Sequence, residues 1–164
     1  MKGIYRKLNA FFWTMFAKKT LGNFHAKIRA NGFTVLSKNT QVGINVHFNG
    51  LKVLGKGKVF IGNNFHSGFG CLILTGIHDY NGEKIPYDHK VIYKDVNIAD
   101  NVWLGINVTI LPGVTIGEGA IIQAGSVVVN DIPAYSIAGG HPAKVFLKRD
   151  IEHYNKLKVA KSFL

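Results

Sequence analysis

The side chains best suited to proton transfer in this sequence are its seven histidines, and one of them, His78, stands where the sequence pattern changes. Histidine titrates near neutral pH and serves as a general base. Any reaction in which an alcohol acts as the nucleophile at neutral pH needs such a base, because a hydroxyl group ionises poorly. His78 closes a series of short repeats and precedes an irregular segment, so we place it at a corner of the fold beside a loop. Taken alone, the same position also suits a structural histidine bonded to a backbone carbonyl.

Two further candidates for chemistry are given structural interpretations. His66 lies twelve residues before His78, at a related place in the repeats, and we interpret it as structural or as a substrate contact. Cys71 is the single cysteine, which excludes an internal disulfide and a CxxC metal or redox motif. The repeats place Cys71 at an inward position, so we assign it to the core rather than to nucleophilic chemistry.

A six-residue period runs through most of the chain and predicts its fold. Stepping by six from Ile98, every first position carries a branched aliphatic side chain, and every fifth position carries a small or β-branched one. The first positions are Ile98, Leu104, Ile110, Ile116, Ile122 and Val128, and the fifth positions are Val102, Val108, Val114, Ala120, Ser126 and Ile132. A period of six matches neither an α-helix nor a long alternating strand. It is typical of short parallel strands that turn by a third of a circle, three hexads to a coil, so we expect an all-β protein built as a parallel β-helix.

An earlier block of hexads keeps a phase of its own. Its fifth positions are Val53, Val59, Phe65, Cys71 and Ile77. Between the blocks, residues 79–91 break the pattern, and we expect an inserted loop there. Corners carry residues for which a positive φ costs little, such as Asn63–Asn64, Pro112–Gly113 and Gly117–Gly119.

Both ends of such a stack need caps, and both termini are expected to form short helices. Near the N-terminus, apolar residues recur at helical spacing among basic ones: Ile4, Tyr5, Leu8, Phe11, Phe12, Met15 and Phe16. Residues 1–20 therefore suit either a packed cap or a basic amphipathic helix lying on an anionic membrane, and both readings stay open. Asp150 predicts the N-cap of a helix that carries Ile151, Tyr154 and Leu157. We divide the chain into an N-terminal amphipathic segment, 1–34, a β-helix domain, 35–147, and a C-terminal capping helix, 148–164.

The net charge of +11 is concentrated in the first half of the chain. Residues 1–78 contain 11 Lys and Arg and no Asp or Glu, whereas residues 79–164 contain nine of each sign. Such a half attracts anionic partners. Its basic residues are scattered among glycines and aliphatics, without a helix-turn-helix, zinc finger or RNP motif, so we expect no nucleic-acid partner. No apolar run reaches the ~18 residues of a membrane span, and no secretory signal is recognisable. We expect a cytoplasmic protein, with peripheral contact at the inner membrane face as the open alternative for residues 1–20.

Residues 61–149 resemble the hexapeptide-repeat acyltransferases, most closely the branch that O-acetylates sugars, including galactoside and maltose acetyltransferases. The matching segments are Thr75–Tyr80, Asn101–Gly105, Ile110–Gly117, Gln123–Val128 and Ala138–Lys144. The resemblance implies a left-handed β-helix, a homotrimer with active sites between subunits, acetyl-CoA as donor, and no metal. A zinc-dependent carbonic anhydrase is also built on hexapeptide coils, but it uses two histidines five residues apart, and no pair of histidines here has that spacing.

The resemblance also assigns roles to particular residues. His78 matches the general base. Trp103, Gly105, Ala124 and Gly125 match positions along the CoA groove, and Lys144 and Lys148 match the basic positions near the CoA phosphates. The alternatives are side packing for Trp103 and a solvated basic edge for the lysines. Ile106 departs from the family, which commonly has Ser or Ala there, so no hydroxyl is available at that position to stabilise an oxyanion. His141 departs from the usual Asn, and we infer nothing from it.

The acceptor side rests on fewer residues. Tyr80, Tyr87 and Asp88 lie in the loop after His78, and Asn49 matches, with a one-residue gap, an asparagine that helps bind sugar in galactoside acetyltransferases. Ordinary loop roles suit each of them equally well. The sequence therefore predicts an acetyl-CoA-dependent O-acetyltransferase for a sugar of a surface polysaccharide or its precursor. The alternatives are an acetyltransferase for a small xenobiotic or amino acid, and a non-catalytic β-helix scaffold.

Overall fold

Three parallel sheets wind around a common axis, as the six-residue period predicts. The structure, a computed structural model, describes residues 2–164; Met1, which belongs to the predicted segment 1–34, lies outside the described residues. Sheet I holds β1 (Ile28–Gly32), β3 (Val46–Asn49), β6 (His66–Ser67), β11 (Trp103–Leu104), β14 (Ile121–Ile122), β16 (Ser136–Gly140) and the antiparallel β17 (Ala143–Lys148). Sheet II holds β4 (Lys52–Leu54), β7 (Leu72–Leu74), β12 (Thr109–Ile110) and β15 (Val127–Val128). Sheet III holds β2 (Thr40–Val42), β5 (Val59–Ile61), β10 (Val96–Ile98) and β13 (Thr115–Ile116).

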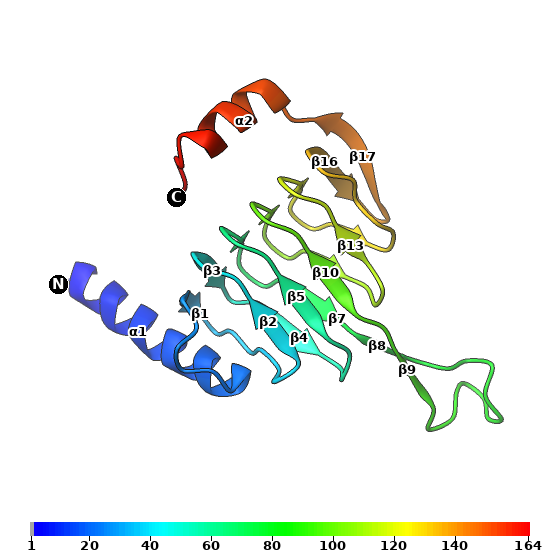
Figure 1. Ribbon diagram of the computed structural model, residues 1–164. Coiled ribbons are helices and arrows are strands. Elements are labelled where there is room, and N and C mark those ends of the chain that lie inside the picture. The colour runs from blue at the N-terminus through cyan, green and yellow to red at the C-terminus, as the bar shows by residue number, and fades with distance from the viewer. Residues whose placement is uncertain (1) are drawn as a thin grey trace.

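The chain cycles from sheet III to sheet I to sheet II, so each full cycle is one coil (Figure 1). In the later block, residues 18 apart face each other, as in the pairs Asn97↔Thr115 and Thr109↔Val127. The earlier coils are longer, because His47 pairs with His66 and Lys52 with Leu72. The phase of the hexads changes across the hairpin, because the paired residues Val59 and Val96 lie 37 residues apart, one more than two coils of 18.

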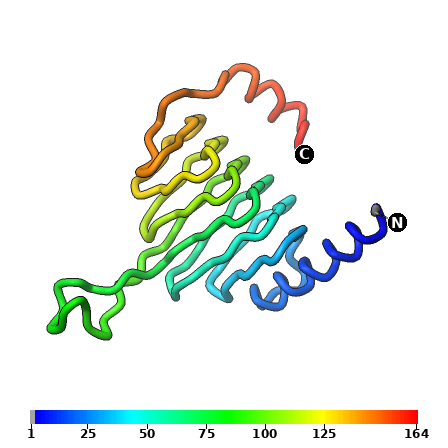
Figure 2. The backbone as a smooth tube through the Cα atoms, turned by 180° about the vertical axis from the view of Figure 1, so that it is seen from behind, coloured from blue at the N-terminus to red at the C-terminus, as the bar shows by residue number. Residues whose placement is uncertain are grey.

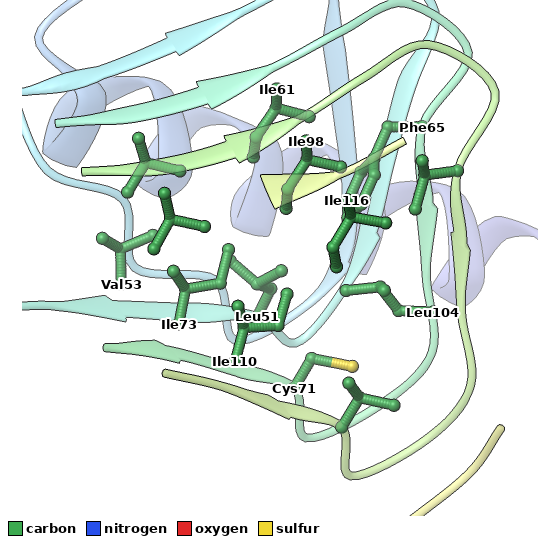
Figure 3. Close-up of a cluster of buried hydrophobic side chains, with 14 of the residues drawn as sticks. Leu51, Val53, Ile61, Phe65, Cys71, Ile73, Ile98, Leu104, Ile110 and Ile116 are labelled. Atoms are coloured by element: carbon green, nitrogen blue, oxygen red, sulfur yellow. The ribbon is translucent and has the colours of Figure 1, made fainter. Parts of the chain in front are cut away.

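The side chains at the predicted inward positions fill the core between the sheets (Figure 3). All twelve positions from Ile98 to Ile132 are buried, and Cys71 is buried among them, where burial raises the pKa of its thiol. Ile77 is the exception to the earlier block, since its side chain is half exposed. The prediction of an inward place for Ile77 is wrong because the chain has already left the coil at Gly76.

The inserted loop leaves the stack as a hairpin of β8 (Gly76–His78) and β9 (Val91–Tyr93), and Figures 1 and 2 show it projecting away from the coils. Its excursion does not disturb the stacking, because β5 and β10 pair in register on either side of it, Val59 with Val96 and Ile61 with Ile98.

The three corners of the coil differ in composition, and we name each by the sheets it joins. At the III–I corner, Asn45, Asn64 and Asn101 adopt φ between 53° and 61°, followed by Gly119 at 67°. Each amide donates to the next: Asn45 Nδ2 to Asn64 Oδ1 at 3.0 Å, and Asn64 Nδ2 to Asn101 Oδ1 at 2.9 Å. Asparagine tolerates this left-handed conformation, and the ladder satisfies its polar groups. The predicted corner residues Asn64, Gly113 and Gly119 are thus confirmed in left-handed turns.

One helix covers the N-terminal end of the stack, and a second helix folds back from the other end along the III–I corner. α1 (Lys2–Leu21) lies across the N-terminal end against β1, and α2 (Ile151–Val159) follows β17 at the other end (Figure 1). Asp150 caps α2 as predicted, accepting a hydrogen bond from the backbone N–H of His153 at 2.9 Å. The stacked strands begin at Ile28, so they extend into the segment 1–34. Among residues 2–164, no helix has the length and apolar character to cross a bilayer.

Candidate active site

His78 ends β8 at the II–III corner, where the hairpin leaves the coil. Its exposed imidazole stacks on the ring of Tyr87, with centroids 4.0 Å apart and an interplanar angle of 22°. The backbone of His78 is paired with Val91 on the returning strand. The imidazole is therefore held against an aromatic wall while its edge is open to solvent, which suits a base that must reach a substrate hydroxyl.

The loop beside His78 is held by two carboxylates. Asp79 accepts from Lys90 Nζ at 2.7 Å and from the N–H of Asn81 at 3.0 Å, and the bond to Lys90 holds the pKa of Asp79 below its usual value. Asp88 accepts from the N–H groups of Lys90 at 2.7 Å and Glu83 at 3.0 Å, and these bonds lower the pKa of Asp88. Asp88 thus has a structural role within the loop. Tyr80, in contrast, is largely exposed.

The predicted donor-side residues gather along sheet I and the I–II corner. Trp103 faces outward from sheet I with half of its surface exposed, between His66 and Ile121 of the neighbouring strands. Gly105, Ala124 and Gly125 follow at the I–II corner of two successive coils. Lys144 and Lys148 are exposed on β17, the last strand of sheet I at the C-terminal end of the stack.

Two of the predicted glycines have structural reasons of their own, one in coil stacking and one in backbone conformation. A Cβ at Gly105 would lie 2.5 Å from the backbone nitrogen of Ala124 in the next coil. Gly125 has open space around it, but its φ of +72° disfavours any side chain. The N–H groups of both glycines are engaged in coil hydrogen bonds, to Ile122 O and Ile106 O, each at 2.8 Å.

Asn49, the predicted sugar contact, is tied into the fold. Its Nδ2 donates to Ser67 O at 2.8 Å and lies 3.2 Å from His66 Nε2, and its Oδ1 accepts from Asn31 at 3.0 Å. Asn49 therefore orients His66. Burial lowers the pKa of His66, and burial with the nearby His66 and Arg29 charges lowers the pKa of His47.

The candidate residues fall into two groups on opposite edges of sheet II. The strands of sheet II are parallel, so all of them begin at the I–II corner and end at the II–III corner. The first edge carries Asn49, Gly105, Ala124 and Gly125, and the second edge carries His78 with its loop. One chain does not bring the two groups together.

Nothing in the sequence indicated a hollow of about 230 Å³ that lies between the III–I corner and α2 with its following tail. Its lining includes Asn45, His47, His66, Tyr154 and Leu164. Asn45 Nδ2 donates to Leu164 O at 3.0 Å, so the tail returns to an early coil. The asparagines at equivalent corners were the available signal, but nothing in their spacing indicates that α2 folds back over them. Within residues 2–164, no group of three or more His, Cys, Asp or Glu side chains is arranged to hold a metal ion.

Comparison with known proteins agrees with this geometry. Residues 95–130 match the family of bacterial transferase hexapeptide repeats. The matched residues contain β10 to β15, which are the strands of the later, regular coils. The chain is also similar to a hexapeptide-repeat acetyltransferase from Vibrio cholerae, solved with acetyl-CoA, at a TM-score of 0.69 and 26% identity, over 82% of this chain and 74% of that one. The shared fold is a left-handed β-helix, as expected from the resemblance.

Two further relatives extend the comparison. A galactoside acetyltransferase solved with coenzyme A matches at a TM-score of 0.65 and 30% identity, over 73% of this chain and 60% of that one. A protein of Schizosaccharomyces pombe, provisionally named an acetyltransferase, is 39% identical over 119 residues, which are 67% of this chain and 56% of that protein. The chain spans about half the length or less of the curated relatives it matches.

Proposed function

We propose that the protein is an acetyl-CoA-dependent O-acetyltransferase acting on a sugar hydroxyl. The observation that carries the proposal is His78, an exposed imidazole stacked on Tyr87 at the root of a projecting loop. His78 would accept the proton of the acceptor hydroxyl as its oxygen attacks the thioester carbonyl. The tetrahedral intermediate would then collapse, with the C–S bond broken and the proton passed to the leaving CoA thiolate. The acetyl-CoA and CoA complexes of the similar structures support this choice of donor.

The site is completed, in this proposal, by a second subunit. The outward side of sheet II is largely apolar. It carries Leu54, Leu72, Leu74, Leu111, Val127 and Val129, together with Lys52 and Thr109. Packing copies around a closed ring through this face would bring the II–III corner of one subunit to the I–II corner of its neighbour. His78 would then face Trp103, Gly105, Ala124 and Gly125 of that neighbour, and Lys144 and Lys148 would meet the CoA phosphates. We propose a homotrimer on this basis.

Oxyanion stabilisation must come from the backbone in this site. Ile106 supplies no hydroxyl, and the N–H groups of Gly105 and Gly125 are already engaged. We assign the oxyanion donor to another backbone N–H of the I–II corner, where it would act on the developing negative charge of the intermediate.

On the acceptor side, Tyr80 and Tyr87 offer aromatic faces to a sugar ring, and Asp88 and Asn49 keep their neighbours in place. We propose a surface polysaccharide or its precursor as the acceptor class, and the inner face of the membrane as the place of action. A small xenobiotic or amino acid is the second acceptor class, and a scaffold without catalysis is the third reading.

Incubation with acetyl-CoA and a panel of sugars, xenobiotics and amino acids, with release of free CoA as readout, tests the proposal. A sugar should be acetylated on oxygen, and His78→Ala should lower kcat by ~10²–10⁴ while acetyl-CoA still binds. His89→Ala, an exposed histidine of the same loop, is the matched control and should keep wild-type turnover. Wild-type turnover by His78→Ala would refute the base assignment. If none of the acceptors in the panel causes release of CoA, the scaffold interpretation is favoured.

A further inference from the structure

α1 is apolar on two opposite sides, and the coil uses only one of them. The inner side packs on the first coil through small residues: Ala10 and Ala17 are buried, and Leu21 joins them at the end of the helix. Thr14 Oγ1 accepts from the N–H of Ala30 at 2.9 Å, and Thr20 Oγ1 accepts from the N–H of Leu36 at 3.0 Å. These contacts fix the rotation of the helix on the coil.

The outer side of α1 carries large apolar residues that are exposed to solvent. Exposed fractions are 67% for Ile4, 74% for Tyr5, 64% for Leu8, 68% for Phe11, 58% for Phe12 and 40% for Met15. Ile4, Leu8, Phe11 and Met15 follow one another at spacings of three or four, so they form one continuous stripe along the helix. We call these six residues the outer stripe. Phe16 is not part of it, since its ring packs on Phe33 at 5.6 Å between centroids.

This arrangement separates the two readings that the sequence leaves open. A cap built from the large residues would bury Phe11 and Phe12 against the first coil, whereas both are mostly exposed. The cap is made by Ala10, Ala17 and Leu21 instead, with Trp13 and Phe16 packed on Phe33. The outer stripe is therefore an exposed apolar surface, of the kind that binds a partner or a membrane outside the subunit.

Charge indicates which apolar phase fits. Arg6, Lys7 and Lys19 are exposed on α1 itself, and the first 78 residues contain 11 Lys and Arg without one Asp or Glu. A second copy docked through the outer stripe would bring two such basic surfaces together, which like-charge repulsion opposes. An anionic phospholipid surface supplies both an apolar layer and negative headgroups, the combination that an interfacial helix needs.

We propose that the outer stripe of α1 inserts into the interface of an anionic phospholipid bilayer, with the N-terminal end of the coil stack facing the membrane. α1 lies across that end of the stack (Figure 1). The side chains of its outer stripe are exposed to solvent. In a homotrimer, which rests on the proposed function, three such helices would face one plane and bind together. Multivalent attachment of this kind is much tighter than the binding of one helix.

Co-sedimentation with vesicles tests the proposal. The full chain is mixed with phosphatidylcholine vesicles, alone or with about 30% phosphatidylglycerol, at about 50 and about 500 mM NaCl. We expect binding to the anionic vesicles at low salt, weaker binding at high salt, and little binding to phosphatidylcholine alone.

The test variant is Leu8→Ser with Phe11→Ser, which removes two large side chains of the outer stripe and leaves the inner side intact. It should bind the anionic vesicles at least about tenfold more weakly, because it loses two large apolar contacts. The matched control is Ile151→Ser with Val159→Ser, two exposed apolar residues of α2 at the opposite end of the stack, which should bind as the wild type does. Thermal unfolding of both variants is expected to stay at the wild-type midpoint.

Three results would overturn the proposal: no sedimentation at low salt, equal binding to neutral and anionic vesicles, or wild-type binding by the Leu8→Ser, Phe11→Ser variant. A change in oligomeric mass of that variant without vesicles would assign the outer stripe to a second copy instead. Acetyl transfer to a soluble acceptor should be unchanged in the variant. If the wild type shows no acetyl transfer, the proposed function is refuted, but the membrane inference is not.

Discussion

Two imidazoles, His47 and His66, face each other on neighbouring strands of sheet I with their ring centroids 6.1 Å apart. Burial is the first cause that lowers the pKa of each below the ordinary value of 6.5. Each therefore takes up a proton less readily in the folded protein than an ordinary histidine does. An unfolded chain exposes the same two residues to water, where they take up protons more readily.

This difference predicts a loss of stability on mild acidification. Below about pH 6.5 the unfolded chain binds more protons at these residues than the folded chain, so the free energy of unfolding falls as pH decreases. The stabilisation from the neutral imidazoles is fully present above that pH. Asp79 and Glu118 have lowered pKa values, so their titration affects a lower pH range. Thermal midpoints measured between about pH 7.5 and 5.5 should fall in the wild type.

The variant His47→Gln with His66→Gln stays neutral throughout this range and should show a flatter dependence of the thermal midpoint on pH. The same slope in variant and wild type would contradict the prediction. His25→Gln with His153→Gln serves as control, since both replace histidines outside the His47–His66 pair.

Single residues also mark the limit of what the sequence predicts. The hexads identified the buried aliphatics because inward positions repeat with the backbone geometry. The hexads could not distinguish a glycine that a ligand requires from one that the next coil requires. Gly105 is of the second kind, because a side chain there would collide with the backbone of Ala124. Asn49 and Asp88 were expected to contact a sugar, yet the structure gives both of them hydrogen bonds within the fold. The partners of Asn49 lie 17 or 18 residues away in the chain, so no local pattern shows them.

At the scale of elements, α2 is fixed to the coil by one buried phenol. Tyr154 Oη donates to Glu118 Oε1 at 2.9 Å and accepts from Asn101 Nδ2 at 2.7 Å, at the end of the asparagine ladder. Burial together with the bond to Glu118 raises the pKa of Tyr154 well above its ordinary value. The phenol therefore stays protonated and continues to donate.

Tyr154→Phe should detach α2 in part, since it removes both hydrogen bonds and leaves Glu118 and Asn101 without them. We expect a loss of ~1–3 kcal/mol in the free energy of unfolding, the usual contribution of two hydrogen bonds of which one has a charged partner. Glu118 keeps its ion pair with Lys158 in this variant. Urea denaturation measures it. Tyr80→Phe, at an exposed phenol of the loop, should be neutral, and an unchanged midpoint for Tyr154→Phe would show that α2 is held by packing alone.

The element boundaries followed from the sequence where the coils are regular. Coils of 18 residues keep the hexad phase, and there the strands lie where they were expected. Longer coils shift the phase, as at His47 and His66, and the hairpin removes Ile77 from the inward series. The return of the tail to Asn45 depends on contacts between distant segments, and the helical spacing around Tyr154 predicts α2 without its direction.

At the scale of the whole molecule, assembly and activity are expected to be lost together. Leu74→Glu with Leu111→Glu places two charges on the apolar outer side of sheet II, which the proposed subunit contacts would bury unpaired. The wild type should have a mass three times the 18.1 kDa of one chain, and the variant should be a monomer without acetyl transfer.

The control places the same charges on another face. Asn97→Glu with Thr115→Glu affects two paired, exposed residues of sheet III and should keep both the assembly and the activity. Light scattering after size exclusion measures the mass. A wild-type monomer with full turnover would contradict the shared site.

The in-register pairing of β5 with β10 has a consequence for how this protein diversifies. Because the coils close beneath the hairpin, the segment between its two strands can change in length or composition without a change in the core. The corresponding segment of a relative could be grafted between Asp79 and Lys90, whose ion pair closes the base of the loop. The chimaera should fold with unchanged stability. Under the proposed function, selection for a different acceptor therefore acts on the loop while the coils stay constant.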